Sequence, residues 1–300
     1  DVTIMEEGTE LLGRIQNGGA LPMITSCSPG WIKFCEHYYP EFIPNLSTCK
    51  SPQQMYGALV KSYYAEHAGI DPRDIFVVSV MPCTAKKFEC KRPELGHDGM
   101  ADVDVSLTTR ELAQMIRQAG ILFDRLPDEK CDDMLGEASG AGHIFGATGG
   151  VMEAALRTVY EVVTGKTLEK VEFTAVRGVE AIKEAEYDLN GTKVKVAVTS
   201  GLDNAKKLLD MVKSGEKDYT FIEVMACPGG CIGGGGQPVP VDASIRQKRR
   251  EAIFNCDRTS ELRKSHENPE IKTLYDTWLG KPLSEKAHSL LHTHYHAQNR

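Results

Sequence analysis

The stretch Glu223-Val224-Met225-Ala226-Cys227-Pro228-Gly229-Gly230-Cys231-Ile232-Gly233-Gly234-Gly235-Gly236-Gln237-Pro238 decides how the rest of the chain is interpreted. It sets two cysteines four positions apart among six glycines. Glycine tolerates positive φ and lets backbone N–H groups approach a bulky inorganic group. The apolar run 219–225 predicts a strand that ends just before Cys227, and α/β sheets bind ligands at such strand ends. The stretch is interpreted as the binding loop of a metal cluster; the alternative is a glycine-rich loop with two incidental thiols.

Length and composition exclude several classes of protein. The chain has 300 residues, 41% of them hydrophobic and 26% charged, which is enough for a large core or two sub-domains. A net charge of −7 argues against a nucleic-acid partner. No apolar run approaches the roughly 18 residues that a membrane span needs. Nine scattered cysteines do not suggest a disulfide framework, so a reducing, cytoplasmic location is predicted.

Two further predicted strands also end at cysteines. The run 21–25 leads into Ser26-Cys27-Ser28-Pro29-Gly30, where the start of a helix would favour a thiolate. The run 75–81 is almost wholly apolar, as buried parallel strands are, and leads into Pro82-Cys83-Thr84-Ala85-Lys86. Four soft ligands from dispersed segments favour an iron–sulfur cubane. Zinc is the competing metal, although zinc sites usually combine two cysteine pairs and only one is present.

The remaining pattern alternates helices and strands and predicts an α/β fold. Thr3 and Glu6 predict a capping box at the first helix, and Asn190-Gly191 predicts a hairpin turn. Glycines between 136 and 150 are interpreted as positions of close packing against a cofactor or another backbone segment. Helices are expected at 3–16, 31–39, 53–68, 109–119, 151–163 and 204–214, and further strands at 102–107, 171–176, 184–189 and 193–199.

Several polar side chains allow two interpretations from spacing alone. Glu7, Glu10 and Arg14 share one helix face, which most simply is a solvated face. The C-terminal histidines could bind metal, but a solvated tail is the preferred prediction; they are His288, His292, His294 and His296. The other cysteines are predicted to be structural thiols: Cys35, Cys49, Cys90, Cys131 and Cys256.

Three segments together resemble the signature motifs of [FeFe]-hydrogenases. They are Thr25-Ser26-Cys27-Ser28-Pro29, the run from Met81 to Glu89, and the run from Glu223 to Cys231 with Gly234-Gly235-Gly236-Gln237-Pro238. The resemblance spans nearly the whole chain, since segments 108–112, 146–154 and 264–268 also look like the family.

The resemblance implies a fold, a cofactor and a reaction. The fold would be α/β, with two lobes that each hold a mixed, largely parallel sheet flanked by helices, and the active site in the cleft between them. Residues 1–240 would form the catalytic domain and 241–300 a helical segment wrapping it, whereas an upstream part and accessory iron–sulfur domains would be absent. The H-cluster, a [4Fe–4S] cubane joined through a cysteine to a di-iron subcluster with CO, CN and azadithiolate, would reduce protons reversibly to H2.

The matching motif positions imply roles for individual residues. Cys83, Cys227 and Cys231 would hold the cubane, with Cys231 bridging to the di-iron subcluster, and Cys27 would relay protons. The rest of the proton path would be Glu7, Glu10, Ser47 and Arg14. Lys86 would donate to a cyanide, Ser51, Pro52 and Gln53 would contribute to contacts with the diatomic ligands, and Met81, Phe145 and Met225 would form an apolar wall.

One departure from the family leaves the fourth cubane ligand open. Most members have Cys-Cys where this chain has Cys27-Ser28. With Ser28 as the ligand position, 55 residues separate it from Cys83 and 144 separate Cys83 from Cys227, separations associated with the family's ligands. Either Ser28 ligates through oxygen, or the register shifts so that Cys27 ligates and the relay is a serine. The first alternative is preferred, although an alkoxide is a harder ligand than a thiolate.

The resemblance also implies partners and competing functions. Expected partners are H2 and protons, a ferredoxin or an iron–sulfur or flavin electron-transfer subunit, and maturation proteins. A sensory hydrogenase of low turnover would lack the relay thiol, and a hydrogenase-like iron–sulfur assembly scaffold would not need the Glu7, Glu10 and Ser47 path or Lys86. This chain has all of these residues, which favours the catalytic interpretation.

Overall fold

The computed structural model describes residues 1–130, 132, 134–178 and 180–298. Its largest sheet has four strands in the order β1-β8-β7-β6. Strand β8 pairs in parallel with both β1 and β7, and β6 and β7 form the antiparallel hairpin predicted around Asn190-Gly191. The strands are β1 (Met23–Thr25), β6 (Ile182–Leu189), β7 (Thr192–Ser200) and β8 (Phe221–Met225).

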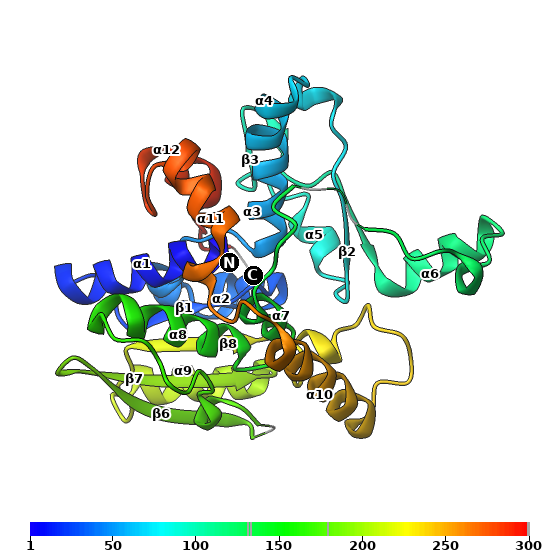
Figure 1. Cartoon of the computed structure of the whole chain (residues 1–300). Coiled ribbons are helices and arrows are strands. Elements are labelled where there is room, and N and C mark those ends of the chain that lie inside the picture. The colour runs from blue at the N-terminus through cyan, green and yellow to red at the C-terminus, as the bar shows by residue number, and fades with distance from the viewer. Residues whose placement is uncertain (131, 133, 179, 299–300) are drawn as a thin grey trace.

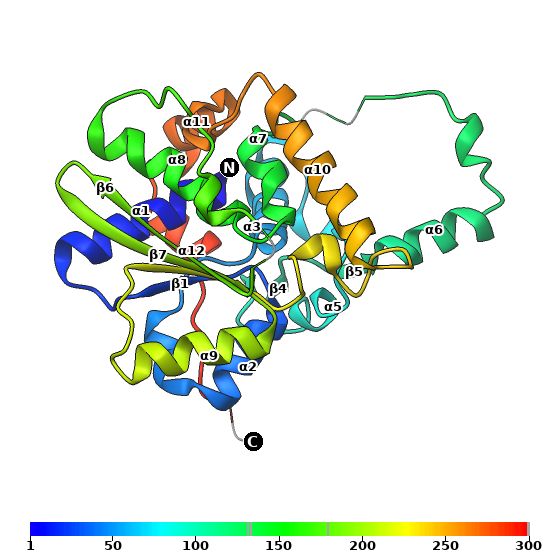
Figure 2. The same cartoon turned by 90° about the horizontal axis from the view of Figure 1, so that it is seen from below.

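Helices cover both faces of this sheet, as Figures 1 and 2 show. On one face α1 (Val2–Asn17) and α8 (Gly150–Thr164) enclose a core with Met152 and Phe221, and on the other α2 (Pro29–Tyr38) and α9 (Leu202–Lys213) enclose a core around Trp31. Burial of both faces explains why β8 is apolar at four of its five positions. The predicted α/β fold with mainly parallel strands between helices is confirmed.

The second sheet pairs β2 (Val78–Met81) in parallel with β5 (Val105–Thr108), and β3 (Gly96–His97) pairs antiparallel with β4 (Met100–Ala101). The prediction that 75–81 is buried on both faces is wrong. Val78 is 47% exposed and Val80 42%, whereas the alternate residues Ser79 and Met81 are less exposed. The described chain therefore covers one face of this sheet and leaves the other open.

The other helices connect and cover these sheets. These helices are α3 (Pro52–Leu59), α4 (Ala65–Ala68), α5 (Lys86–Glu89), α6 (Thr109–Gln118), α7 (Gly140–His143), α10 (Ala243–Thr259), α11 (Pro269–Leu274) and α12 (Glu285–Leu291). Thr108 caps α6 through a capping box with Glu111.

Two local predictions are wrong for reasons that lie in tertiary contacts. Helix α1 begins at Val2 without a capping box. The hydroxyl of Thr3 donates a hydrogen bond to Met55 Sδ, and the carboxylate of Glu6 is hydrogen-bonded to His292, so neither side chain is available to cap the helix. Segment 171–176 is not a strand and ends in a 3-10 turn. The carbonyl of Val171 accepts a hydrogen bond from Arg157 of α8 rather than from a neighbouring strand.

The C-terminal segment returns to the start of the chain. Ile271 and Leu274 of α11 share a hydrophobic cluster with Val2 at the start of α1. Helix α12 leads into His292, which is 5% exposed. The prediction of a solvated histidine tail is wrong at this residue, because His292 is buried with its Nε2 atom 3.0 Å from Glu6 Oε2 of α1. Within the described residues, no helix is both long and apolar enough to cross a membrane.

Candidate metal centre

Three strand ends bring the predicted thiols together. Strand β1 ends at Thr25, β2 at Met81 and β8 at Met225, so each cysteine segment begins just beyond the sheet. One cavity between the two sheets is lined by Cys27, Ser28, Pro82, Cys83, Lys86, Met225, Ala226, Cys227, Gly230, Cys231 and Gly234. Three clustered thiols with a serine and a fourth thiol beside them fit the donor set of an iron–sulfur cluster, and none of these cysteines is in a disulfide.

The glycines of the 227–238 loop allow a close approach between backbone segments. Gly229 and Gly230 adopt φ of 82° and 94°, which disfavours residues with a side chain. A Cβ on Gly234 would lie 2.0 Å from the carbonyl oxygen of Pro82. The loop can therefore lie directly against the end of β2, which brings Cys227 and Cys231 toward Cys83. The same holds at Gly149, where a Cβ would meet the Val176 oxygen at 2.0 Å, so the predicted close packing against backbone is confirmed there.

Gly234→Ala is expected to displace this loop from Pro82. The clash with a backbone atom should destabilise the protein by about 1–3 kcal/mol and reduce the iron retained after reconstitution. Urea unfolding and iron analysis measure the two effects. Gly13→Ala is the matched control, because nothing lies within 4 Å of its added methyl group and alanine favours helix. Full stability and iron content in Gly234→Ala would contradict this role of the loop.

Cys27 lies where two cavities meet. It lines the thiol cavity and also a second, small cavity with Glu7, Ser51, Pro52 and Phe145. A hydrogen bond with Cys231 lowers the pKa of Cys27, and Lys86 adds to this effect against the opposing effect of burial. The predicted direction is correct, but the main cause is the neighbouring sulfur. Ser28 lines only the thiol cavity and is the N-cap of α2.

The predicted proton-path residues form a buried chain. The Glu7 carboxyl accepts a hydrogen bond from the Thr25 hydroxyl at 2.5 Å. Ser47 Oγ donates to Glu10 Oε2 at 2.8 Å, and Arg14 pairs with Glu10 Oε1 at 2.7 Å. Arg14 also donates to the carbonyl oxygen of Leu46, which fixes the outer end of the chain. Because Glu7 and Glu10 are 4% and 8% exposed, this face of α1 is buried, and the alternative of a solvated face is wrong.

Burial changes the chemistry of Glu7. It raises the pKa of Glu7 from its ordinary 4.5 to about 8, against the opposing hydrogen bond from Thr25. The second carboxyl oxygen, Oε2, is buried without a hydrogen-bond partner among the described residues. A carboxyl in this state keeps its proton near neutral pH and can exchange it with a neighbour in the cavity.

Lys86 belongs to a network that depends on Glu89. Lys86 Nζ lies 2.9 Å from Glu89 Oε2, and the same oxygen accepts from Ser51 Oγ at 2.8 Å and Gln53 Nε2 at 2.6 Å. Glu89 raises the pKa of Lys86 against its burial, so the cation is retained inside the protein. Glu89 thus organises three predicted site residues, although no role was predicted for it. Its position three residues after Lys86 on a helix could have indicated the pair.

Two of the three residues predicted for an apolar wall line the cavities beside Cys27. Met225 lines the thiol cavity and Phe145 the second cavity, whereas Met81 is absent from the residues that line either. Glu223, another residue without a predicted role, accepts hydrogen bonds from the backbone N–H groups of Gly149 and Met152 at the start of α8. Burial raises the pKa of Glu223 against these bonds, and the carboxyl ties the Cys227 strand to the glycine-rich turn.

The remaining cysteines have different environments. Cys35, Cys49 and Cys90 are buried, as structural thiols would be. Cys256 is exposed on α10, so the expectation of a structural thiol is wrong there. Cys131 lies outside the described residues.

The comparisons with known proteins identify the family. The model of the iron-only hydrogenase large subunit, C-terminal domain, matches residues 1–235, and that of the iron hydrogenase small subunit matches 243–298. The chain therefore belongs to the iron-only hydrogenase family. An apo [FeFe]-hydrogenase structure from Chlamydomonas reinhardtii matches with a TM-score of 0.87 and 46% identity over 100% of this chain and 82% of its own.

Curated relatives include enzymes and assembly factors. The NADP-reducing hydrogenase subunit HndD of Solidesulfovibrio fructosivorans is 52% identical over 100% of this chain, and iron hydrogenase 1 of Clostridium pasteurianum is 50% identical over 98%. The chain spans about half of each, 52% of their lengths. A cytosolic Fe–S cluster assembly factor of Danio rerio is 32% identical over 93% of this chain and 69% of that protein.

Proposed function

We propose that this chain forms the catalytic domain of an [FeFe]-hydrogenase that reduces protons reversibly to H2. The observation that carries the proposal is the convergence of Cys83, Cys227, Cys231 and Cys27 on one cavity, next to a buried chain of acidic and hydroxyl groups. Residues 1–240 are assigned to this domain and 241–300 to a helical segment that wraps it.

Cys83, Cys227 and Cys231 are the thiols that would hold the [4Fe–4S] part of the H-cluster. Cys231 would also bridge to the di-iron part, which the cavity holding Ser51, Pro52 and Phe145 would enclose. When bound, the cluster would pass on electrons from the electron partner and supply the metal site at which protons are reduced. Of these two cavities, Ser28 lines the thiol cavity alone and Cys27 lines both, which supports Ser28 as the fourth ligand position and leaves Cys27 free to relay protons.

The protein's own contribution is to deliver protons and to exclude water. Protons would enter beside Arg14, pass between Glu10 and Ser47 to Glu7, and reach the thiol of Cys27, which lines the same small cavity as Glu7. Lys86 would direct its N–H groups toward a cyanide ligand, held in place by Glu89. Met225, Phe145 and Met81 are assigned to the apolar surroundings of the di-iron part.

Two alternatives make different use of the same fold. An assembly factor like the 32% identical relative would carry iron–sulfur clusters without needing a buried proton chain. A sensory hydrogenase would turn over slowly. The intact series from Arg14 to Cys27 favours the enzyme over both, since buried ionisable groups are costly to retain without a use.

The electron partner is proposed to be a ferredoxin or an iron–sulfur or flavin subunit, consistent with a relative named as a subunit of an NADP-reducing hydrogenase. Maturation proteins would install the di-iron part. A cytoplasmic location stays a prediction.

Infrared spectroscopy of the reconstituted and matured protein tests the proposal. Bands of metal-bound CO and CN⁻, which fall where protein does not absorb, are expected together with H2 evolution from a reduced viologen. Cys27→Ala should retain the bands and lose most of the turnover, because the thiol relays protons without holding the cluster. A protein that binds four irons but shows no such bands after treatment with a synthetic di-iron complex would support the assembly factor instead.

A further inference from the structure

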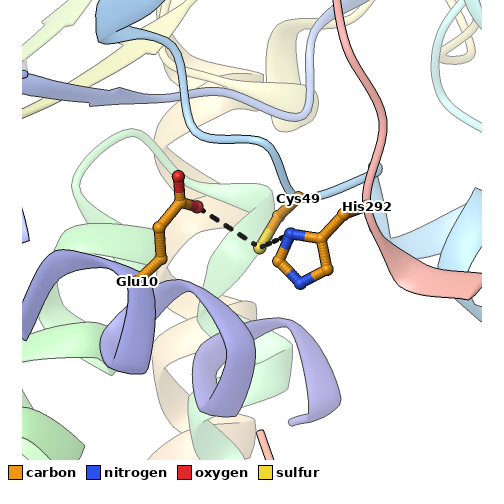
Figure 3. Close-up of side chains that lie close together, drawn as sticks. All are labelled: Glu10, Cys49 and His292. Atoms are coloured by element: carbon orange, nitrogen blue, oxygen red, sulfur yellow. Dashed lines mark hydrogen bonds between the residues drawn. The ribbon is translucent and has the colours of Figure 1, made fainter. Parts of the chain in front are cut away.

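A second group of ligand-type side chains lies beside the proposed proton path. Figure 3 shows Glu10 of α1, Cys49 of the loop before α3 and His292 after α12 pointing toward one another. Cys49 Sγ lies 3.9 Å from Glu10 Oε2 and 4.0 Å from His292 Nδ1, and one ligand atom of each residue lies within 4.8 Å of the others. All three residues are less than 9% exposed. Three segments far apart in sequence thus place a carboxylate, a thiol and an imidazole around one point.

The imidazole is oriented as a metal ligand would be. Glu6 Oε2 lies 3.0 Å from His292 Nε2, and Glu6 is itself held by the Tyr275 hydroxyl and the Leu283 N–H. A carboxylate with these donors accepts the Nε2–H, which leaves the lone pair of Nδ1 directed at Thr48 Oγ1, 2.8 Å away, and toward Cys49. Metal-bound histidines typically give their second N–H to a carboxylate in this manner.

Charge and size also suit a small divalent cation. The carboxylates of Glu6 and Glu10 act on Cys49, and Arg14 pairs with Glu10. Zn–S and Zn–N bonds of about 2.3 and 2.0 Å in a tetrahedral site place sulfur and nitrogen about 3.5 Å apart. The distance of 4.0 Å between Cys49 Sγ and His292 Nδ1 would therefore have to shorten when a metal binds. A mixed thiolate, imidazole and carboxylate set is typical of zinc and similar borderline-soft ions.

We propose that Glu10, Cys49 and His292 bind a divalent transition-metal ion of the zinc class, with a water as fourth ligand. Binding replaces the thiol proton of Cys49, which leaves to solvent, and draws the Nδ1 lone pair away from Thr48. The ion would bind to Glu10 Oε2, the oxygen that accepts the hydrogen bond from Ser47. This consequence rests on the proposed function: with Glu10 bound to metal, protons could no longer pass between Arg14 and Glu7, and the site would inhibit H2 turnover.

Titration with Co²⁺ tests binding independently of activity, because cobalt–thiolate absorption reports the ligand directly. The wild-type chain should bind one more equivalent with a thiolate charge-transfer band than Cys49→Ala and His292→Ala in the same preparation, and Zn²⁺ should displace it. Cobalt bound by the cubane cysteines contributes equally to the absorption of the wild type and the variants, so the difference between them reports the second site. Glu6→Gln should weaken the affinity about 10–100-fold, as expected for a residue that orients a ligand. Cys35→Ser, at a buried thiol elsewhere, is the control and should bind as the wild type does.

Each result decides one step. Equal cobalt binding in wild type and Cys49→Ala, with folding of both confirmed by circular dichroism, would overturn the site whether or not the protein evolves H2. With active protein, Zn²⁺ should inhibit the wild type at least about tenfold more strongly than Cys49→Ala, in line with the loss of a ligand. If cobalt binds at the three residues but Zn²⁺ does not inhibit H2 turnover, the metal site stands and its proposed effect on proton transfer is wrong.

Discussion

Replacing Glu7 by glutamine is expected to lower the rate of H2 formation by about 10²–10⁴-fold, the usual contribution of a positioned proton donor. Glutamine matches the shape of Glu7 and can accept the hydrogen bond from Thr25, but it cannot exchange a proton with Cys27. Viologen-driven H2 evolution measures the rate. Iron content should be unchanged, because Glu7 does not line the thiol cavity. The CO and CN⁻ bands should be retained, because glutamine keeps the size and shape of the Glu7 side chain in the second cavity.

Glu7→Asp is the matched variant because it keeps a carboxyl one methylene shorter. It should retain more turnover than Glu7→Gln. Wild-type rates in Glu7→Gln, with the infrared bands intact, would show that protons take another route.

The same residue should make the wild type less stable as pH rises. Since the pKa of Glu7 is raised from 4.5 to about 8 on folding, the folded carboxyl keeps a proton that the unfolded chain has lost between these pH values. Its contribution is complete below pH 4.5 and is lost as pH rises to about 8, with a slope of up to about 1.4 kcal/mol per pH unit. Glu7→Gln should lack this slope in urea unfolding, and identical pH profiles would contradict the raised pKa.

Arg157→Met is expected to destabilise the fold by about 3–5 kcal/mol, because it leaves buried carboxylates without their shared cation. The Arg157 side chain is 0% exposed and contacts Glu153 at 2.6 Å and Asp257 at 2.7 Å. Asp257 lies on α10, in the part that matches the small subunit, and Arg157 on α8, in the part that matches the large subunit. The ion pairs therefore connect the two matched regions inside one chain.

Urea unfolding measures this loss. Lys193→Met is the control, since its pair with Glu186 is exposed and should contribute no more than about 1 kcal/mol. A change in Arg157→Met as small as in this control would mean that Arg177 and Arg263, which also contact these carboxylates, compensate fully.

The sequence alone predicts the features that depend on short stretches of chain. Apolar runs that end at Cys27, Cys83 and Cys227 predict three strand ends, where α/β sheets bind ligands. Strands β1 and β8 are parallel neighbours, so the ends before Cys27 and Cys227 lie at one edge of the same sheet, whereas β2, before Cys83, belongs to the second sheet and is brought to them by the tertiary structure. The hairpin at Asn190-Gly191 follows from local turn chemistry. The alternation of elements predicts an α/β fold on the same basis.

Tertiary contacts decide what local pattern leaves open. Glu6 has the spacing of a capping residue, yet it bonds to His292, 286 positions away, because a buried carboxylate needs donors that only the folded chain supplies. Val78 and Val80 have the pattern of a buried strand, but whether a sheet face is covered depends on distant segments. The hydrogen bonds by which Glu89 holds Ser51 and Glu223 holds the Gly149 turn depend on the tertiary structure and could not be predicted from local sequence. Local sequence determines which groups can make an interaction, and the three-dimensional arrangement determines which of them meet, since each buried polar group must find its partner across the fold.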